Sequence, residues 1–422
     1  MDIDPMEMGA VLGQIPLFRE LQRLLLSQSG PVNWEVAGQI ARGVAQVRGP
    51  GAGPSRDDFA SYEEACRLAQ MRVTQLTGLE APSSITKVEL ADRTAWVNAN
   101  LEAFRPFVER LAKGLESQFG SAAGGFGGSF GLPQFGDPGA PSAPGGFGEG
   151  GFGAGGGGEL EGPMGAASLG VGALFGMLGP LILGLEIGFL VGFLSREVLG
   201  NYDLCLPRGD PGTLWFVMPN IAEAQSGLEV DPRQFQMYLA LHEVAHQLEF
   251  TSIRWVRPYF TGMVERFIDA AEIDSSEAMN RLQALGDPEQ LQRLMSHPEE
   301  LLPMLITPPQ QELAHQIETL MAVLEGYAEW IVDQTGSELL PECAKIREGL
   351  SRRRAERSTV ERLLEGLLGI DLKPQQYRAG VKFVAAVAAA GQQAKLWESA
   401  AALPTAAELP EPAKWLSRVA FS

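Results

Sequence analysis

The segment His242-Glu243-Val244-Ala245-His246 has the residue types and the spacing for metal-assisted hydrolysis. On an α-helix, residues four apart project from the same face, so His242 and His246 could bind one divalent ion. Glu243 lies beside the first histidine, where a carboxylate can take a proton from water and return it to a leaving amine. The chain has only four histidines, and two of them fall in this pattern. We therefore predict a zinc site here rather than a pair of ordinary core histidines.

A third protein ligand is expected, because catalytic zinc is usually held by three side chains with one position left for water. The apolar stretch 320-LMAVLEGYAEWIVD-333 carries Glu325, Glu329 and Asp333 at four-residue intervals. Carboxylates on such a hydrophobic helix are costly unless a cation or hydrogen-bond donors meet them. We predict Glu325 as the ligand and Glu329 as an acceptor for the second ring N–H of a ligand histidine. The alternative is a solvated acidic stripe.

The remaining polar candidates are less specific. His297 lies in a polar stretch before a proline, and His315 has acidic neighbours, which favours solvent exposure. Hydrolysis also needs a donor that stabilises the developing oxyanion. Tyr238, Tyr259 and Tyr327 are candidates for that role, and no spacing selects among them.

A helix must carry the histidine motif, and 231-DPRQFQMYLALHEVAHQLEF-250 has the signals for one. Asp231 suits the N-cap position, and Pro232 suits the first helical position. The β-branched and aromatic run 213-TLWFVMPNI-221 predicts a strand. Helical periodicity marks the other elements, at 57–78, 90–117, 258–284, 287–303, 309–334, 341–367 and 374–400. The sequence therefore predicts a mainly α fold with a small β component.

Composition divides the chain into four parts. Residues 1–118 form an N-terminal helical lobe, in which Trp34 and Trp96 are expected in the core. Residues 119–163 are rich in Gly, Pro and Phe and predict a flexible linker. The catalytic region is expected at 164–400, and the Pro-broken tail 401–422 should pack on the surface.

The stretch 164–194 raises the question of a membrane span, since it has no charge before Glu186. Pro180 and several glycines interrupt it, which argues against a span and for a buried helix. Small residues recur every four positions, on a face that another helix could approach closely; they are Gly184, Gly188 and Gly192. We expect no membrane association, with a membrane-associated protease as the alternative.

Charge and cysteine content narrow the partners and the compartment. The chain has 33 Lys and Arg against 52 Asp and Glu, a net charge of -19, which would repel a phosphate backbone. We expect no nucleic acid partner. The first residues lack the pattern of a secretory signal, and Cys66, Cys205 and Cys343 are too few and too scattered for a disulfide framework. These features predict a cytoplasmic protein. Nothing in the sequence specifies its oligomeric state.

The sequence resembles a bacterial family of zincin-like metallopeptidases over nearly its whole length outside the Gly-rich tract. The zinc chemistry of the family resides in two of the similar stretches, 240-ALHEVAHQLEFTSIRWVRPY-259 and 324-LEGYAEWIVD-333. The other similar stretches are 32-VNWEVAGQIAR-42, 93-RTAWVNANLEAFRP-106, 199-LGNYDLCLP-207, 366-GLLGIDLKPQQYRAGVKFV-384 and 403-LPTAAELPEPAKWLSR-418.

The resemblance implies a helical chain built around a zincin-like active-site helix. It implies His242, His246 and Glu325 as zinc ligands and Glu243 as general base, acting on a peptide or protein substrate. By analogy with zincin folds, the predicted strand 213–221 would hold an extended peptide along its edge. A second hypothesis from a different class is a non-catalytic, zinc-stabilised helical scaffold that recruits partners.

Overall fold

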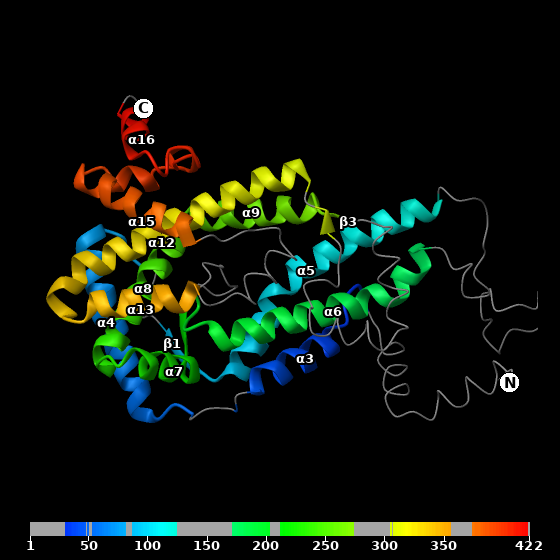
Figure 1. Cartoon of the computed structure of the whole chain (residues 1–422), viewed down its shortest axis with the longest axis horizontal. Helices are drawn as coiled ribbons and strands as arrows, with labels where there is room; N and C mark the ends of the chain where they lie inside the picture. Colours follow the sequence, from blue (N-terminus) through cyan, green and yellow to red (C-terminus); the bar gives the residue numbers. More distant parts are fainter. Residues whose placement is uncertain are drawn as a thin grey trace, which may run out of the picture.

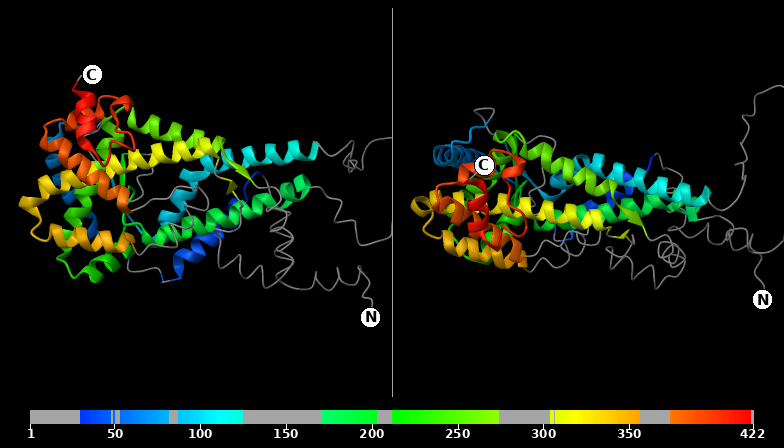
Figure 2. Two further views of the ribbon diagram at one scale, coloured as in Figure 1. Left: turned by 45° about the horizontal axis from the view of Figure 1, so that its top comes forward. Right: turned by 90° about the horizontal axis from the view of Figure 1, so that it is seen from above.

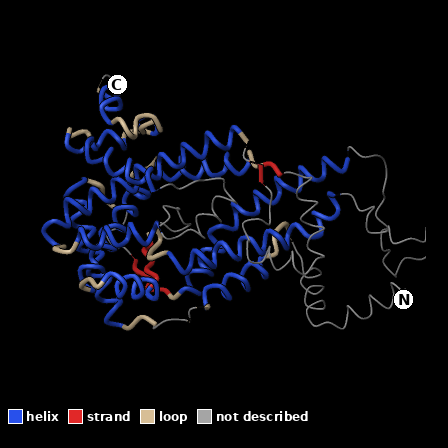
Figure 3. Tube along the Cα trace, viewed as in Figure 1, coloured by secondary structure: helices blue, strands red, loops and turns tan. Residues whose placement is uncertain are grey.

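The computed structural model describes residues 30–47, 49, 53–81, 87–124, 171–202, 212–273, 304–305, 307–355 and 374–420. Within these ranges long helices dominate and the strands are short (Figure 3). The predicted fold class, mainly α with a small β component, is confirmed. Several of the long helices run lengthwise through an elongated molecule (Figures 1 and 2), among them α5 (Arg93–Gly124), α6 (Val171–Glu197), α9 (Val256–Asp269) and α12 (Pro308–Leu339).

The N-terminal elements are α3 (Trp34–Gln46), α4 (Arg56–Thr77), β1 (Lys87–Ala91) and α5 (Arg93–Gly124). Helix α4 begins with a capping box, in which Ser55 and Asp58 bond each other's backbone N–H. It ends at Gly78, whose φ of 72° is open to glycine at little cost. The helix predicted from residue 90 begins instead at Arg93, because the preceding residues form β1. Trp96 lies in the core as expected, whereas Trp34 is only partly buried.

Helix α6 (Val171–Glu197) contains the apolar stretch, and its glycine face packs against α3. A Cβ atom at Gly184 would lie 2.5 Å from the Asn33 carbonyl oxygen, and one at Gly188 would lie 2.8 Å from the Ile40 Cβ. The predicted close approach of a second helix is therefore confirmed. Among the described residues, one helical window, Gly179–Glu197, is long and apolar enough to cross a membrane, and 78% of it is buried inside the protein. A helix buried in the core of a soluble protein can be equally long and apolar.

Two parallel strands lie next to the histidine motif. Strand β2 (Thr213–Val217) pairs in parallel with β1, in register from Lys87 opposite Thr213 to Ala91 opposite Val217. The opposite edge of β2 is covered by the chain itself, through an antiparallel bridge between Gly200 and Phe216.

Two expectations about this strand are therefore wrong. Residues 218–221 are not part of it but begin α7 (Met218–Leu228), which has a proline in its first turn. The free edge that was expected to hold a peptide is also absent from β2, because β1 and the Gly200 segment occupy its two sides.

Helices make up most of the described part of the C-terminal half. After α8 (Pro232–Ser252) come α9 (Val256–Asp269), α12 (Pro308–Leu339), α13 (Cys343–Ala355), α15 (Pro374–Ala389) and α16 (Pro412–Val419), with two 3-10 turns at Gln393–Trp397 and Ala400–Ala402. The helix predicted at 258–284 ends at Asp269, where β3 (Glu272–Ile273) pairs with β4 (Met304–Leu305). The helix predicted at 374–400 ends at Ala389, just before Gly391 with a φ of 69°. The predicted helix 287–303 and the end of the helix at 341–367 lie outside the described residues.

Two hydrophobic cores hold these elements together. One is formed by α3, α5 and α6 with Val217 of β2 and Ile268 of α9. The other is formed by α4, β1, β2, α8, α9, α12 and the C-terminal helices. The second core also takes in Trp415 of α16, which is fully buried with its ring against Phe383. The core around α8 thus combines residues from both sides of the Gly-rich tract, which itself lies outside the described residues beyond Gly124.

Candidate metal centre

The histidine motif lies on α8 (Pro232–Ser252), which begins as the sequence predicts. The Asp231 side chain accepts hydrogen bonds from the N–H groups of Arg233 and Gln234, and Pro232 occupies the first turn. From Leu239 to Phe250 every residue of the helix is buried. Helices α4 and α12 and strand β2 contact α8. The motif therefore lies at the centre of the larger core.

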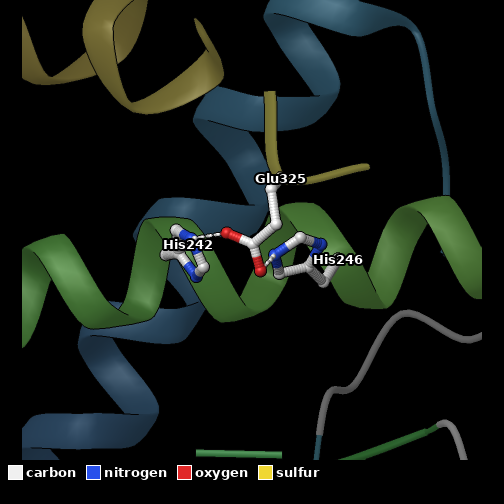
Figure 4. A group of neighbouring side chains, drawn as sticks. All are labelled: His242, His246 and Glu325. Carbon is white, nitrogen blue, oxygen red and sulfur yellow. Dashed lines mark ion pairs between the residues drawn. The ribbon is translucent and has the colours of Figure 1, made fainter. Parts of the chain in front are cut away.

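Glu325 reaches the two histidines from α12. Its Oε2 atom is 3.6 Å from His242 Nε2, and its Oε1 atom is 3.7 Å from His246 Nε2. Figure 4 shows the carboxylate between the two imidazoles, with one oxygen toward each ring. One ligand atom from each of the three residues can be chosen so that all lie within 4.8 Å of one another. Helices far apart in sequence thus bring these three side chains to a common centre.

The three side chains suit a divalent ion of borderline softness. Two imidazole nitrogens and one carboxylate are a donor set found at catalytic zinc sites. His242, His246 and Glu325 are 4%, 0% and 2% exposed, so bulk water does not solvate the carboxylate. A buried carboxylate beside neutral imidazoles is costly unless a positive charge accompanies it. The donor set and its burial therefore fit a metal ion, and the residues that would hold it are these three.

A second carboxyl group, on Glu249, orients one of the histidines. Its Oε2 atom lies 2.7 Å from His246 Nδ1, so that ring can present Nε2 to the metal position while Nδ1–H donates to Glu249. Both side chains are completely buried. Burial raises the pKa of Glu249 well above its ordinary value of 4.5, and the charge of Glu325 raises it further. Glu249 is not among the site residues predicted from the sequence, although its spacing of three residues from His246 on one helix is a local signal for this contact.

Glu329 has other partners. Its Oε1 atom accepts a hydrogen bond of 3.0 Å from the Tyr238 hydroxyl, and its Oε2 atom lies 3.1 Å from Arg347 Nε. Arg347, on α13, also pairs with Asp333. The ring of Tyr238 stacks on His242, with centroids 6.4 Å apart and 11° between the planes. Glu329 therefore reaches the histidine pair by way of Tyr238, and its role as a direct partner of a ligand histidine stays a prediction.

Glu243 faces away from solvent, toward the chain that precedes β2. Its Oε2 atom accepts the backbone N–H of Tyr202 at 3.1 Å, and its side chain is 3% exposed. The Tyr202 ring is buried and stacks on Phe250, with centroids 5.6 Å apart, and lies 6.0 Å from the His246 ring. The predicted base, which follows His242 in the sequence, is thus held by a hydrogen bond from the backbone of Tyr202.

The three tyrosines proposed as oxyanion donors lie in different surroundings. Tyr238 stacks on His242, as described above. Tyr327 is buried among aromatic rings, with Trp397 5.0 Å away, and burial raises its pKa. Tyr259 lines a cavity of about 600 Å³ between α9, α12 and the C-terminal segment, together with the exposed His315. None of the three metal-binding candidates lines that cavity. Of the three tyrosines, Tyr238 is therefore the one whose ring contacts a predicted metal ligand. His297 lies outside the described residues.

Comparison with known proteins agrees with this geometry. The family model for zincin-like metallopeptidases matches residues 32–416. The chain belongs to the zincin-like metallopeptidase family. The match spans the helix with His242 and His246 and the helix with Glu325, and it confirms the resemblance found in the sequence.

A crystal structure from Chloroflexus aurantiacus, described as a putative hydrolase with a novel fold, is similar to this zincin-like protein. The TM-score is 0.63 at 22% identity, and the alignment covers 93% of this chain and 99% of the other. At that identity the likeness concerns the fold. No curated protein sequence matches the chain. Family membership and fold are therefore established, and the reaction has to be argued from the site.

Proposed function

We propose that the protein is a zinc-dependent peptidase that cleaves peptide bonds in peptide or protein substrates. The observation that carries the proposal is the convergence of His242, His246 and Glu325 within 4.8 Å at a buried centre. Glu243 lies next to the first of these residues on the same helix, where a general base is required. The two histidines and Glu325 share one centre, and the chain belongs to the zincin-like metallopeptidase family. Together these facts support a catalytic site better than a structural one.

Each residue has a defined task in this proposal. His242 and His246 bind through Nε2 and Glu325 through its carboxylate, while Glu249 keeps the His246 ring in the orientation that presents Nε2. A zinc ion held by these three residues would supply two things, a pKa of water lowered toward about 7 and polarisation of the scissile carbonyl group. The Glu243 carboxylate takes the proton released by the attacking water and delivers it to the leaving nitrogen.

Structural zinc sites usually have four protein ligands, whereas catalytic sites keep one position open. Within the described residues, one group of His, Cys, Asp and Glu side chains is arranged to hold a metal, and it has three members. That number favours catalysis over the zinc-stabilised scaffold. The two described cysteines, Cys66 and Cys343, are free, which agrees with our proposal of a cytoplasmic protein.

Metal analysis tests the site. We expect purified full-length protein to contain close to one zinc per chain and a His246→Ala variant to contain almost none. His315→Ala is the matched control, because His315 is exposed on α12 away from the cluster, and it should keep its zinc. Equal zinc in the wild type and the His246→Ala variant would defeat the assignment.

An activity assay distinguishes the proposed peptidase from a non-catalytic scaffold. Glu243→Gln keeps the shape of the side chain and removes its ability to take a proton, so we expect normal zinc content and a loss of at least ~100-fold in kcat. Labelled casein and a mixture of synthetic peptides serve as substrates. Glu312→Gln, on the exposed face of α12, should retain full activity. Zinc binding without cleavage of any substrate by the wild type would favour the scaffold.

A further inference from the structure

The segment Leu199–Tyr202, which follows α6, is fixed to strand β2. The N–H of Val217 donates to the Leu199 carbonyl at 2.8 Å, and Gly200 forms the antiparallel bridge to Phe216. The buried amide of Asn201 adds a hydrogen bond of 2.8 Å from Nδ2 to the Thr213 carbonyl. These backbone and amide contacts fix the position of the segment relative to the core.

The same segment lies directly against Glu243. The Tyr202 N–H donates to Glu243 Oε2 at 3.1 Å. A Cβ atom at Gly200 would overlap the carboxyl carbon of Glu243 and lie 2.8 Å from Oε2. The carboxylate of Glu243 therefore occupies the space where any other residue at position 200 would place its side chain.

Backbone conformation does not account for this glycine. The described glycines with positive φ are Gly30, Gly49, Gly78 and Gly391. Gly200 is not among them, so an alanine could adopt its backbone angles without the strain of a left-handed conformation. The atoms that a side chain at position 200 would meet first are those of the Glu243 carboxylate, which would have to move.

We propose that Gly200 and the backbone N–H of Tyr202 together position the general base Glu243. This inference rests on the proposed function, in which Glu243 moves the proton. A donor that is part of a fixed backbone holds a carboxylate in one place without reorganisation, and a misplacement of about 1 Å at a reacting group can cost ~100-fold in rate. Gly200 allows the carboxylate to reach Tyr202 N–H, and that hydrogen bond keeps it there.

Kinetics of zinc-loaded Gly200→Ala test the positioning role. The three atoms nearest to the added methyl group all belong to the Glu243 carboxylate, which it displaces. We therefore expect kcat to fall by ~100-fold with KM and zinc affinity within about twofold of the wild type. Gly192→Ala is the control, because its methyl group would lie 2.7 Å from Val44 Cβ at the contact between α6 and α3. That control should lower the melting temperature and leave kcat unchanged. An unchanged kcat in Gly200→Ala would overturn the inference.

A thermal-unfolding cycle tests the contact without any need for activity. It compares the wild type, Gly200→Ala, Glu243→Ala and the double variant as full-length proteins. We expect Gly200→Ala to lower the melting temperature of the wild type. In the Glu243→Ala background, which lacks the carboxylate, the same substitution should lower the melting temperature by less than half as much. Failure of Gly200→Ala to fold, with recovery in the double variant, would be the extreme form of that result.

Two outcomes of the cycle would sink the inference. One is an equal loss of melting temperature in both backgrounds, and the other is failure of both Gly200→Ala proteins to fold. In either case the methyl group would be meeting something other than Glu243. A wild type that cleaves nothing would instead defeat the proposed function, and the cycle would still decide whether Gly200 and Glu243 share one space.

Discussion

The Nδ1 atom of His246 lies 2.7 Å from the Oε2 atom of Glu249, one helical turn further along α8. Both side chains are buried, so water cannot replace either partner. When the Nδ1–H of His246 donates to Glu249, the ring leaves Nε2, 3.7 Å from Glu325, as the nitrogen that could bind a metal. A residue that touches no metal thus determines which atom of His246 can bind one.

Removing Glu249 should weaken zinc binding without abolishing it. Glu249→Ala leaves a buried ring N–H without a partner and should reduce zinc affinity about 10- to 100-fold. Glu249→Gln can still accept that hydrogen bond and should lose less. Affinity is measured by competition with a chromogenic chelator, with the exposed Glu312→Gln as control. If the alanine variant binds zinc as tightly as the wild type, Glu249 does not orient His246.

Gly380 should matter to the metal site although it lies on another helix. A Cβ atom at Gly326, next to Glu325, would lie 2.5 Å from the carbonyl carbon of Gly380, and one at Gly380 would overlap the Ala322 carbonyl oxygen. Helices α12 and α15 therefore meet backbone to backbone. Gly380→Ala must push them apart, at a cost of about 1–3 kcal/mol, and should displace the neighbouring Glu325.

Urea unfolding and zinc competition together measure that effect. We expect Gly380→Ala to lower both the stability and the zinc affinity. Gly336→Ala is the matched control on α12 itself, since its methyl group would meet only side-chain atoms, 3.3 Å from Leu340 Cδ1. It should be neutral or slightly stabilising. A Gly380→Ala protein as stable as the control would contradict the close contact between the helices.

The packing of α6 on α3 can be tested by comparing two glycine-to-alanine substitutions, one on the glycine face of α6 and one on the exposed side of α3. Gly188→Ala would bring a methyl group 2.8 Å from Ile40 Cβ and 2.9 Å from the Ala37 carbonyl oxygen, which should cost about 1–3 kcal/mol. Gly43→Ala, on the exposed side of α3 with no atom within 4 Å of its methyl group, should gain about 0.5–1 kcal/mol. Chemical denaturation of the two variants measures the difference. Similar effects at both positions would mean that α6 does not pack on α3 through this face.

The part of the site that the sequence predicts is the part set by local spacing. Two histidines four apart on a capped helix must share a face, and an acidic residue in an apolar helix needs a partner, so His242, His246 and Glu325 could be identified. Glu249 follows from the same rule of helical spacing and could have been found with them. Each of these residues could be identified from the sequence of its own helix, without knowledge of how the helices pack.

What the sequence does not predict depends on contacts between distant segments. Strand β1 is five residues long and is not predicted from the sequence, because nothing in so short a segment shows that β2 will pair with it. The predicted helix 90–117 wrongly includes the last two residues of the strand. The contact between Gly200 and Glu243 likewise exists only in the folded chain. The helix that begins at Met218 is different, since Pro219 in its first turn was a local signal for it.

The C-terminal segment should lose part of its stability in acid. Arg418 binds the Glu408 carboxylate at both oxygens, at 2.8 and 3.0 Å, and the Thr405 N–H adds a bond of 2.8 Å. The Arg418 guanidinium, followed by the Thr405 N–H, holds the pKa of Glu408 below its ordinary value of 4.5. A carboxyl group whose pKa is lower in the folded state contributes stability that is present above about pH 4.5 and is lost as the pH falls through the folded value.

The stability difference between the wild type and Glu408→Gln isolates this contribution from other titrating groups. Because Arg418 is 39% exposed, we expect about 1 kcal/mol at pH 7, shrinking toward zero as the pH falls below the folded pKa. Glu411→Gln is the control, since Glu411 pairs with Lys414 on the exposed surface and should change stability by less than ~0.5 kcal/mol at any pH. Urea titrations at intervals from pH 7 to pH 3 give the two curves. A Glu408→Gln difference that stays constant over that range would mean that the carboxylate is not held by Arg418, because only a group with a shifted pKa links its protonation to folding.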